Sequence, residues 1–214
     1  MRRFWTMLAH CHGQTWNASK LVRSMGLTDK TVRSYLDVLT GTFLVRQLQP
    51  WHTNVAKRQV KAPKIYLRDS GLLHRLLGIE DRHGLLGHPQ AGASWEGFAL
   101  EQTLAAIRPA EAYFWSTHGG AEIDLFFIQG GHRFGIEFTL TDAPTATRSM
   151  RIALDDLKLR HLWVIHAGRD RFPMDEVITA WPLGEVTGLA THINAPGGRN
   201  PSSWVVDERI VNAH

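Results

Sequence analysis

Two segments with alternating apolar residues, separated by a pair of glycines, constrain the fold more than any other feature. They span residues 121–128 and 133–140, and the turn between them contains Gly130-Gly131. Alternation with a period of two predicts β-strands, and two adjacent glycines predict a tight hairpin turn. With the glycines as the turn, Gln129 faces His132. The resulting register places apolar pairs on one face: Ile123 with Phe138, Leu125 with Ile136 and Phe127 with Phe134.

On the other face the same register brings Asp124 opposite Glu137 and Glu122 opposite Thr139. Like charges directly opposite in a strand pair are destabilising, so Asp124 and Glu137 need a neighbouring cation, a shared proton or free solvent. Mg²⁺ or Mn²⁺ would meet the first need, because hard cations bind carboxylate oxygens. The pair is therefore a candidate metal site, and a well-solvated surface pair is the alternative.

The charge of the chain is distributed unevenly. The net charge is +4, but residues 1–79 contain 13 Lys and Arg against 3 Asp and Glu, whereas acidic residues predominate in residues 80–214. A basic half indicates a polyanionic partner, most simply nucleic acid. The alternative is a basic surface that packs on the acidic half of the chain or on a partner protein.

Residues 17–41 have the pattern of a helix-turn-helix. Asn17 and Thr28 are predicted N-caps of two short helices, and Gly26 and Gly41 are predicted to end them. In such a motif the outward side chains of the second helix can enter a DNA major groove. Here the outward side chains are Lys30, Arg33, Ser34 and Asp37, and the predicted nucleic-acid contacts are Lys30, Arg33 and Ser34.

Strands are predicted after these helices, over residues 43–48, 55–60 and 64–67. Helices followed by a β-hairpin describe a winged helix-turn-helix. A basic wing typically binds phosphates and adds affinity without reading sequence, although winged helices also serve as protein-docking modules. The basic side chains of this hairpin are Lys57, Arg58, Lys61 and Lys64.

Cap and loop signals then divide the chain. Asp69 or Ser70 is predicted to begin a helix, residues 84–93 to form a linker, and Ser94 to cap a helix with Glu96 in its first turn. The predicted divisions are a winged-helix domain of residues 1–80, a second domain of residues 84–185, and a tail of residues 186–214 that is loop or partly disordered.

The remainder of the C-terminal half alternates between strands and a helix. Strands are predicted from residue 113 to 116, from 161 to 166 and from 177 to 181, with a helix over residues 146–159. Together with the glycine hairpin, this order predicts an α/β (α+β) domain with a mixed sheet.

Four short sequences, in this order, resemble the C-terminal region of a group of prokaryotic AAA-type ATPases (domain of unknown function 4143). In that group an ATPase domain precedes a winged helix and a PD-(D/E)XK nuclease-like domain, which has the restriction-endonuclease-like fold. The resemblance covers roughly residues 1–183. The four sequences are Lys64-Ile65-Tyr66-Leu67-Arg68-Asp69-Ser70-Gly71-Leu72, Trp95-Glu96-Gly97-Phe98, Glu122-Ile123-Asp124-Leu125 and Ile136-Glu137-Phe138-Thr139.

The nuclease signature places an acidic residue on a helix, then Asp, a hairpin, and Glu-X-Lys on the next strand. The resemblance implies a catalytic set made of Glu96, Asp124, Glu137 and Thr139, with Asp124 and Glu137 as ligands of Mg²⁺ or Mn²⁺. Thr139 stands where the family has a catalytic Lys, which would orient the attacking water and stabilise charge on the phosphate. Threonine carries no positive charge, so efficient phosphodiester cleavage is not expected unless Lys158 or Arg151 takes that role.

The sequence contains no Gly-rich phosphate-binding loop with Lys-Ser/Thr. We therefore expect no ATP site and no ATPase activity from this chain alone, and an ATPase domain would be a partner in cis or in trans. The single cysteine, Cys11, and the lack of an apolar run long enough to span a membrane predict a cytoplasmic protein with no membrane partner.

Three functions stay open. The favoured hypothesis is a nucleic-acid- or partner-binding module of an AAA-type ATPase-like protein with a degenerate nuclease-like domain. The second is an active Mg²⁺-dependent DNA endonuclease, and the third is a protein-interaction module without a nucleic-acid role. Metal-dependent DNA nicking would distinguish the second from the others, and salt-dependent duplex binding would separate the first from the third.

Overall fold

A computed structural model of the chain describes residues 2–52 and 62–194. The two predicted short helices on either side of Gly26 are present, preceded by a helix and followed by strands. The N-terminal elements are α1 (Arg2–Ala9), β1 (Gln14–Thr15), α2 (Ala18–Met25), α3 (Asp29–Gly41), β2 (Val45–Pro50), β3 (Lys64–Leu67), α4 (Ser70–Leu77) and α5 (Arg82–Leu86).

Local side-chain caps fix the ends of these helices. The Asn17 side chain accepts a hydrogen bond from the N–H of Lys20 at the start of α2. The Thr28 side chain accepts one from the N–H of Thr31 at the start of α3, and Asp69 caps α4 in the same way. Gly26 ends α2 with a φ of 66°, a left-handed conformation that glycine adopts without steric cost. The predicted caps of the first half are therefore confirmed.

The C-terminal half supplies the longest helix and most of the strands. Its elements are α6 (Ala91–Ile107), β4 (Ala112–Ser116), β5 (Glu122–Gln129), β6 (His132–Thr139), α7 (Arg148–Leu157), β7 (His161–His166), β8 (Phe172–Asp175), β9 (Ile178–Pro182), the 3₁₀ turn η1 (Leu183–Glu185) and α8 (Val186–Asn194).

In the described residues nine strands form one mixed sheet, in the order β1-β3-β2-β4-β5-β6-β7-β9-β8. Strands β4, β5 and β6 are antiparallel neighbours, whereas β6, β7 and β9 run parallel. The predicted mixed α/β class is thus confirmed. None of the described helices is long and apolar enough to cross a membrane.

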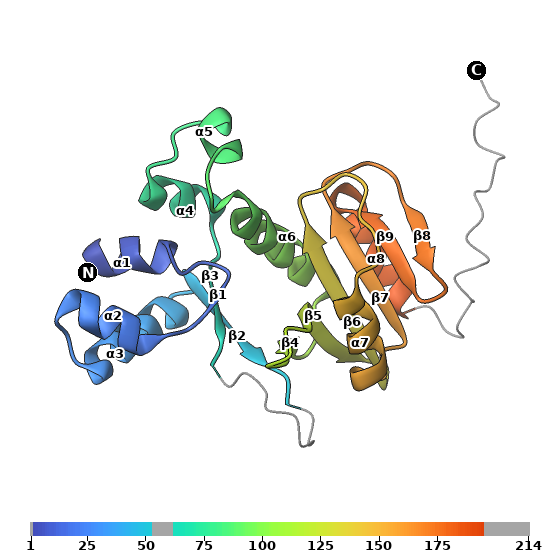
Figure 1. Ribbon diagram of the computed structural model, residues 1–214, viewed down its shortest axis with the longest axis horizontal. Coiled ribbons are helices and arrows are strands. Elements are labelled where there is room, and N and C mark those ends of the chain that lie inside the picture. The colour runs from blue at the N-terminus through green and yellow to red at the C-terminus, as the bar shows by residue number, and fades with distance from the viewer. Residues whose placement is uncertain (1, 53–61, 195–214) are drawn as a thin grey trace.

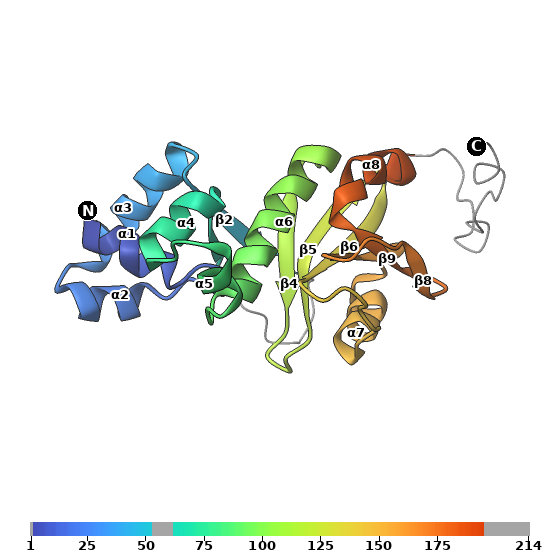
Figure 2. The ribbon, with the colours of Figure 1, turned by 90° about the horizontal axis from the view of Figure 1, so that it is seen from above.

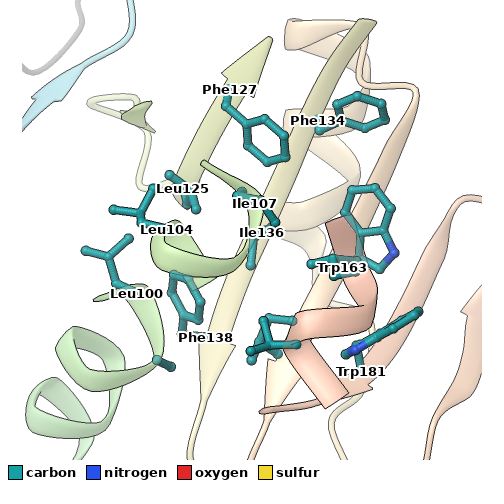
Figure 3. Packing of buried hydrophobic residues seen from close by; sticks show 14 of the residues in the cluster. Leu100, Leu104, Ile107, Leu125, Phe127, Phe134, Ile136, Phe138, Trp163 and Trp181 are labelled. Carbon is teal, nitrogen blue, oxygen red and sulfur yellow. The ribbon is translucent and has the colours of Figure 1, made fainter. Parts of the chain in front are cut away.

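Helices cover both faces of the C-terminal part of the sheet. Side chains of α6 and α8 pack on one face, and Figure 3 shows Leu100, Leu104 and Ile107 of α6 beside Leu125 and Ile136 of the hairpin. Helix α7 packs on the other face, in a separate apolar cluster. Burial of these faces supplies the main driving force for this half, because apolar area removed from water contributes roughly 25 cal/mol per Å².

The two halves of the chain share the sheet. Strand β2 pairs in parallel with β4, where Gln49 lies beside Tyr113 and Pro50 beside Phe114. Helix α6 lies between the N-terminal helices and strands β5–β7 in both ribbon views (Figures 1 and 2). Residues that are distant in sequence therefore meet at a junction formed by β3, α6 and β5.

The predicted hairpin register is confirmed from the turn inward. Gln129 pairs with His132, Phe127 with Phe134, and Leu125 with Ile136. The prediction that Ile123 shares the face of Leu125 is wrong, because Ile123 packs in the cluster under α7. The reason is a β-bulge: β5 gains one residue relative to β4 between Ile123 and Phe126, which reverses the alternation of faces.

Several predicted boundaries in the second half are also wrong. The predicted linker, residues 84–93, contains the end of α5 and the start of α6. Ser94 lies inside α6, with its Oγ 2.7 Å from Nε2 of His74. The predicted tail begins with α8, whose Val186 and Leu189 are buried against the sheet. The predicted strand over residues 55–60 lies outside the described residues, as does the tail beyond Asn194.

Candidate functional site

Asp124 lies where the ladder between β5 and β6 is interrupted. Its Oδ2 accepts a hydrogen bond of 3.1 Å from the backbone N–H of Phe138, next to Glu137. The residue is 8% exposed, so its carboxylate is withdrawn from solvent. The bulge in β5 accounts for this inward position, since bulges commonly redirect a side chain.

A lysine from the N-terminal half contacts this carboxylate. Nζ of Lys64, on β3, lies 3.1 Å from Oδ1 of Asp124 and 3.3 Å from Oε1 of Glu96, and it also pairs with Glu122. The side chain of Lys64 is 6% exposed, so the prediction that it belongs to a surface wing is wrong. An ammonium group has three N–H donors, and three carboxylates surround this one.

Tyr66 reaches the same cluster from β3. Its hydroxyl donates a hydrogen bond of 2.5 Å to Oε1 of Glu96, the atom that also faces Lys64. Lys64 and Tyr66 are two residues apart on a strand, so their side chains leave the same face. Helix α6 supplies Glu96 in its second turn, and Glu96 and Asp124 both accept hydrogen bonds from Lys64.

The carboxyl groups differ in their affinity for protons. Burial and the neighbouring Asp124 charge raise the pKa of Glu137 well above its ordinary value, and a hydrogen bond with Asp124 adds to the shift. Burial and Asp124 also raise the pKa of Glu96 to about 7, although Lys64 and Tyr66 oppose this. Burial alone would lower the pKa of Lys64, but Asp124, Tyr66, Glu96 and Glu122 outweigh it, and this pKa lies well above its ordinary value.

Of the three ways of tolerating facing carboxylates, the contacts favour a neighbouring cation and a shared proton. The Lys64 ammonium neutralises part of the negative charge, and burial beside Asp124 raises the pKa of Glu137, which favours its protonated form. The third way, free solvation of Asp124, is contradicted by its burial. We call Lys64, Tyr66, Glu96, Glu122, Asp124 and Glu137 the junction cluster.

A second ion network lies farther along α6. Glu101 pairs with Nε of Arg46 and accepts hydrogen bonds of 2.9 Å from Nη2 of Arg46 and from Nε of Arg68. Burial would raise the pKa of Glu101, but these two arginines lower it below its ordinary value. Arg46, Lys64 and Arg68 thus pair with carboxylates of the C-terminal half, so part of the charge asymmetry reflects packing between the halves.

His12 was not predicted as a functional or structural contact. Its Nδ1 accepts from the N–H of Leu67 at 3.0 Å, and its Nε2 donates to the carbonyl of Ala93 at 3.1 Å. Burial lowers the pKa of His12 to about 4, so the ring stays neutral. This ring joins β3 to α6 and lies edge-on to the ring of Tyr66, with 5.4 Å between the ring centroids. No local sequence pattern indicates such a bridge.

The other predicted catalytic positions have different contacts. Thr139 ends β6, and its Oγ1 accepts a hydrogen bond of 3.5 Å from the N–H of Thr141. Lys158 ends α7 in a left-handed conformation. Nη2 of Arg151 lies 3.8 Å from Oδ2 of Asp175. Among the described residues, the cation that contacts Asp124 is Lys64.

The predicted nucleic-acid contacts on α3 are on the surface. Lys30, Arg33 and Ser34 are exposed, but Nε of Arg33 lies 2.6 Å from Oδ2 of Asp29 on the same helix. The predicted wing residues Lys57, Arg58 and Lys61 lie outside the described residues.

The arrangement of the junction cluster does not fit a bound Mg²⁺ or Mn²⁺. The N–H groups of Lys64 take oxygens of Asp124, Glu96 and Glu122, which a hard cation would need as ligands. Within residues 2–52 and 62–194, no group of three or more His, Cys, Asp and Glu side chains has an arrangement that could hold a metal ion. A metal would have to displace the ammonium group.

Two family models match the chain, and both describe domains of unknown function. Residues 1–83 match DUF8612, and residues 91–186 match DUF4143. Lys64 and the carboxylates around it therefore come from regions that match different families.

Two curated relatives are similar over most of the chain. They are the uncharacterized protein Rv2008c of Mycobacterium tuberculosis and the uncharacterized protein Mb2031c of Mycobacterium bovis, each 49% identical over 186 residues. The match covers 87% of this chain but 42% of each relative, so the chain spans less than half the length of these relatives. No solved structure matches the chain significantly.

Proposed function

We propose that this chain is a nucleic-acid-binding module of an AAA-type ATPase-like protein, and that its C-terminal half is a degenerate PD-(D/E)XK nuclease-like domain. The match of residues 91–186 to DUF4143 supports the kinship on which this proposal rests. In this proposal the acidic site no longer performs hydrolysis, and it holds the two halves of the module together.

The position of Lys64 carries the proposal. A hydrolytic metal site needs open ligand positions for water and phosphate. In the junction cluster the Lys64 ammonium is directed at Asp124, Glu96 and Glu122, and its side chain is 6% exposed. Those oxygens are therefore engaged in an internal ion network, and Thr139 supplies no replacement for the family's catalytic Lys.

The order of elements in the N-terminal half supports a nucleic-acid partner. Helix α1, strand β1, helices α2 and α3 and strands β2 and β3 follow the order of a winged helix, with β1, β3 and β2 as adjacent antiparallel strands. After Arg46, Lys64 and Arg68 are assigned to internal ion pairs, exposed basic residues still remain on α1, α2 and α3. Winged helices with basic surfaces bind the phosphate backbone.

A nicking assay tests the loss of hydrolysis. Supercoiled plasmid is incubated with the 214-residue chain and Mg²⁺ or Mn²⁺, beside Asp124→Ala and Lys64→Met variants. We expect the wild type to nick no faster than Asp124→Ala. Metal-dependent nicking that disappears in Asp124→Ala would overturn the degenerate assignment.

A second assay tests the partner. Fluorescence anisotropy with a short labelled duplex, measured over a salt series, should give an association constant that falls linearly with salt on a double-logarithmic plot. The absence of duplex binding even at low salt would contradict the nucleic-acid role and favour a protein-interaction module.

One observation favours an active endonuclease as a second candidate. Lys64 brings an ammonium group within 3.1 Å of Asp124, and its charge matches that of the family's Lys that Thr139 replaces. In that case Lys64 would move from Asp124 toward the phosphate once DNA is bound. The nicking assay separates the two candidates, because Lys64→Met would then abolish nicking that the wild type performs.

A further inference from the structure

We infer that the phosphate backbone of a nucleic acid binds across α1 and α2, through Lys20, Arg23 and the arginines of α1, and not along α3. This inference rests on the proposed nucleic-acid role and specifies its surface. It differs from the expectation drawn from the sequence, which placed the contacts on α3 and on the wing residues Lys57, Arg58 and Lys61.

The first two helices have no acidic residue that could neutralise their charge. Residues 1–28 contain Arg2, Arg3, Lys20 and Arg23 and no Asp or Glu. All four basic residues are exposed, and none forms an ion pair with another described residue. Lys20 and Arg23 are three residues apart in α2, so they share one face of that helix.

A hydrogen bond brings the charges of the two helices together. Nη2 of Arg3, at the start of α1, donates to the carbonyl of Ser24, at the end of α2, at 2.6 Å. The guanidinium of Arg3 therefore lies beside the turn that carries Arg23. The two helices lie side by side at the N-terminal end of the molecule in both ribbon views (Figures 1 and 2).

Helix α3 offers much less positive charge. Its exposed charged residues are Asp29, Lys30, Arg33 and Asp37, two of each sign. Arg33 is already paired with Asp29, which is also the acidic residue nearest in sequence to α2. A nucleic acid binds weakly to a surface whose charges cancel, because its affinity depends on the Lys and Arg side chains that displace counterions from the phosphates.

The experiment compares two matched double variants of the full chain. Lys20→Ala with Arg23→Ala removes two exposed cations from α2, and Lys30→Ala with Arg33→Ala removes two from α3. Thermal melting establishes that each variant is folded. Duplex binding is then measured by anisotropy over a salt series, and vesicles of phosphatidylcholine with and without phosphatidylserine serve as a second probe.

The α2 variant should bind more weakly, with a salt slope smaller by roughly 1.8, because each lost phosphate contact removes about 0.9 from it. The α3 variant should keep a slope close to that of the wild type. An unchanged slope in the α2 variant, or a larger loss in the α3 variant, would overturn this inference while leaving nucleic-acid binding intact. Failure of the wild type to bind duplex would instead remove the proposed function, and selective binding to phosphatidylserine vesicles would assign this surface to membranes.

Discussion

At the scale of single residues, Lys64 decides what the acidic pair can do. Without it, Asp124 and its neighbours would be a group of buried carboxylates in need of a metal ion or protons. With it, an ion network joins β3 to α6 and β5. The cost of burying these charges is high, and it is offset only because each charge has a partner at hydrogen-bond distance.

Replacement of Lys64 by Met should therefore destabilise the chain strongly. Removal of one partner from a buried ion network leaves uncompensated charge, and we expect a loss of about 3 kcal/mol in the free energy of unfolding near neutral pH. Urea unfolding followed by tryptophan fluorescence measures this loss. Lys20→Met, which removes an exposed lysine, should change stability by less than about 0.5 kcal/mol. Equal stabilities of the two variants would contradict a neutralising role for Lys64.

Glu96 should make stability depend on pH. Its pKa is about 7 in the folded chain against an ordinary value of 4.5, so the folded state binds the proton more tightly than the unfolded state. The corresponding stabilisation is complete below about pH 4.5 and is lost as the pH rises toward 7. Glu96→Gln, which keeps an acceptor for Tyr66, should lack this loss.

The urea midpoints of wild type and Glu96→Gln, measured across this range, test the expectation. The urea midpoint of Glu96→Gln should rise relative to that of the wild type as the pH increases from about 4.5 to 7. The matched control is Glu185→Gln, because Glu185 is exposed. A constant difference between wild type and Glu96→Gln over the whole range would show that Glu96 does not titrate as described.

At the scale of elements, α6 is the element on which the two halves meet. It contributes Glu96 to the junction cluster, Glu101 to the arginine network, and the carbonyl of Ala93 to His12. Its approach to β3 is close because Gly97 presents no side chain at the crossing. A Cβ on Gly97 would lie 2.7 Å from Cε1 of His12, closer still to Nε2, and 3.3 Å from Tyr66.

Gly97→Ala should accordingly destabilise the chain, although alanine is the better helix former by about 1 kcal/mol. His12 cannot yield easily, because both ring nitrogens are hydrogen-bonded, and overpacking of this kind costs about 1 to 3 kcal/mol. Gly92→Ala is the matched control on the same helix, since a Cβ there meets nothing within 4 Å. The melting temperature of Gly92→Ala should equal or exceed that of the wild type, and that of Gly97→Ala should be lower. The reverse order would contradict the close approach of α6 to β3 at Gly97.

At the scale of the whole molecule, one sheet and two ion networks connect regions that match separate family models. The pairing of β2 with β4 continues the sheet across the boundary, and both ion networks cross it as well. Such contacts couple the stabilities of the two regions, because the charges of the junction cluster are left unpaired if either region unfolds alone.

The chain should therefore unfold in one cooperative transition. Trp16 lies in the N-terminal core and Trp163 in the C-terminal core. The chain has eight tryptophans, so single-tryptophan variants that keep only Trp16 or only Trp163 are needed to report on each half. Urea curves from both variants and from far-ultraviolet circular dichroism should coincide. Two separated transitions would mean that the halves fold independently and that the shared sheet contributes little to their coupling.

The sequence alone determined features that depend on neighbours along the chain. The caps at Asn17, Thr28 and Asp69 and the Gln129–His132 hairpin register were predictable, because each arises from interactions over a few residues. The proximity of Asp124 to Glu137 was also expected from that register, and the two side chains interact although the ladder ends at Leu125 and Ile136. The bulge that turns Asp124 inward was not predictable, because it arises from pairing with β4.

Only the tertiary structure decided what surrounds the acidic pair. Lys64 is 60 residues from Asp124 and looked like part of a basic surface, and nothing local indicated that β3 would pass under α6. A strongly charged side chain is buried only where several partners converge, and that convergence depends on the sheet order and on the crossing at Gly97. The tertiary structure also explains the charge asymmetry. Arg46, Lys64 and Arg68 pair with carboxylates of the C-terminal half, whereas exposed cations without an acidic neighbour in their own helices remain on α1 and α2.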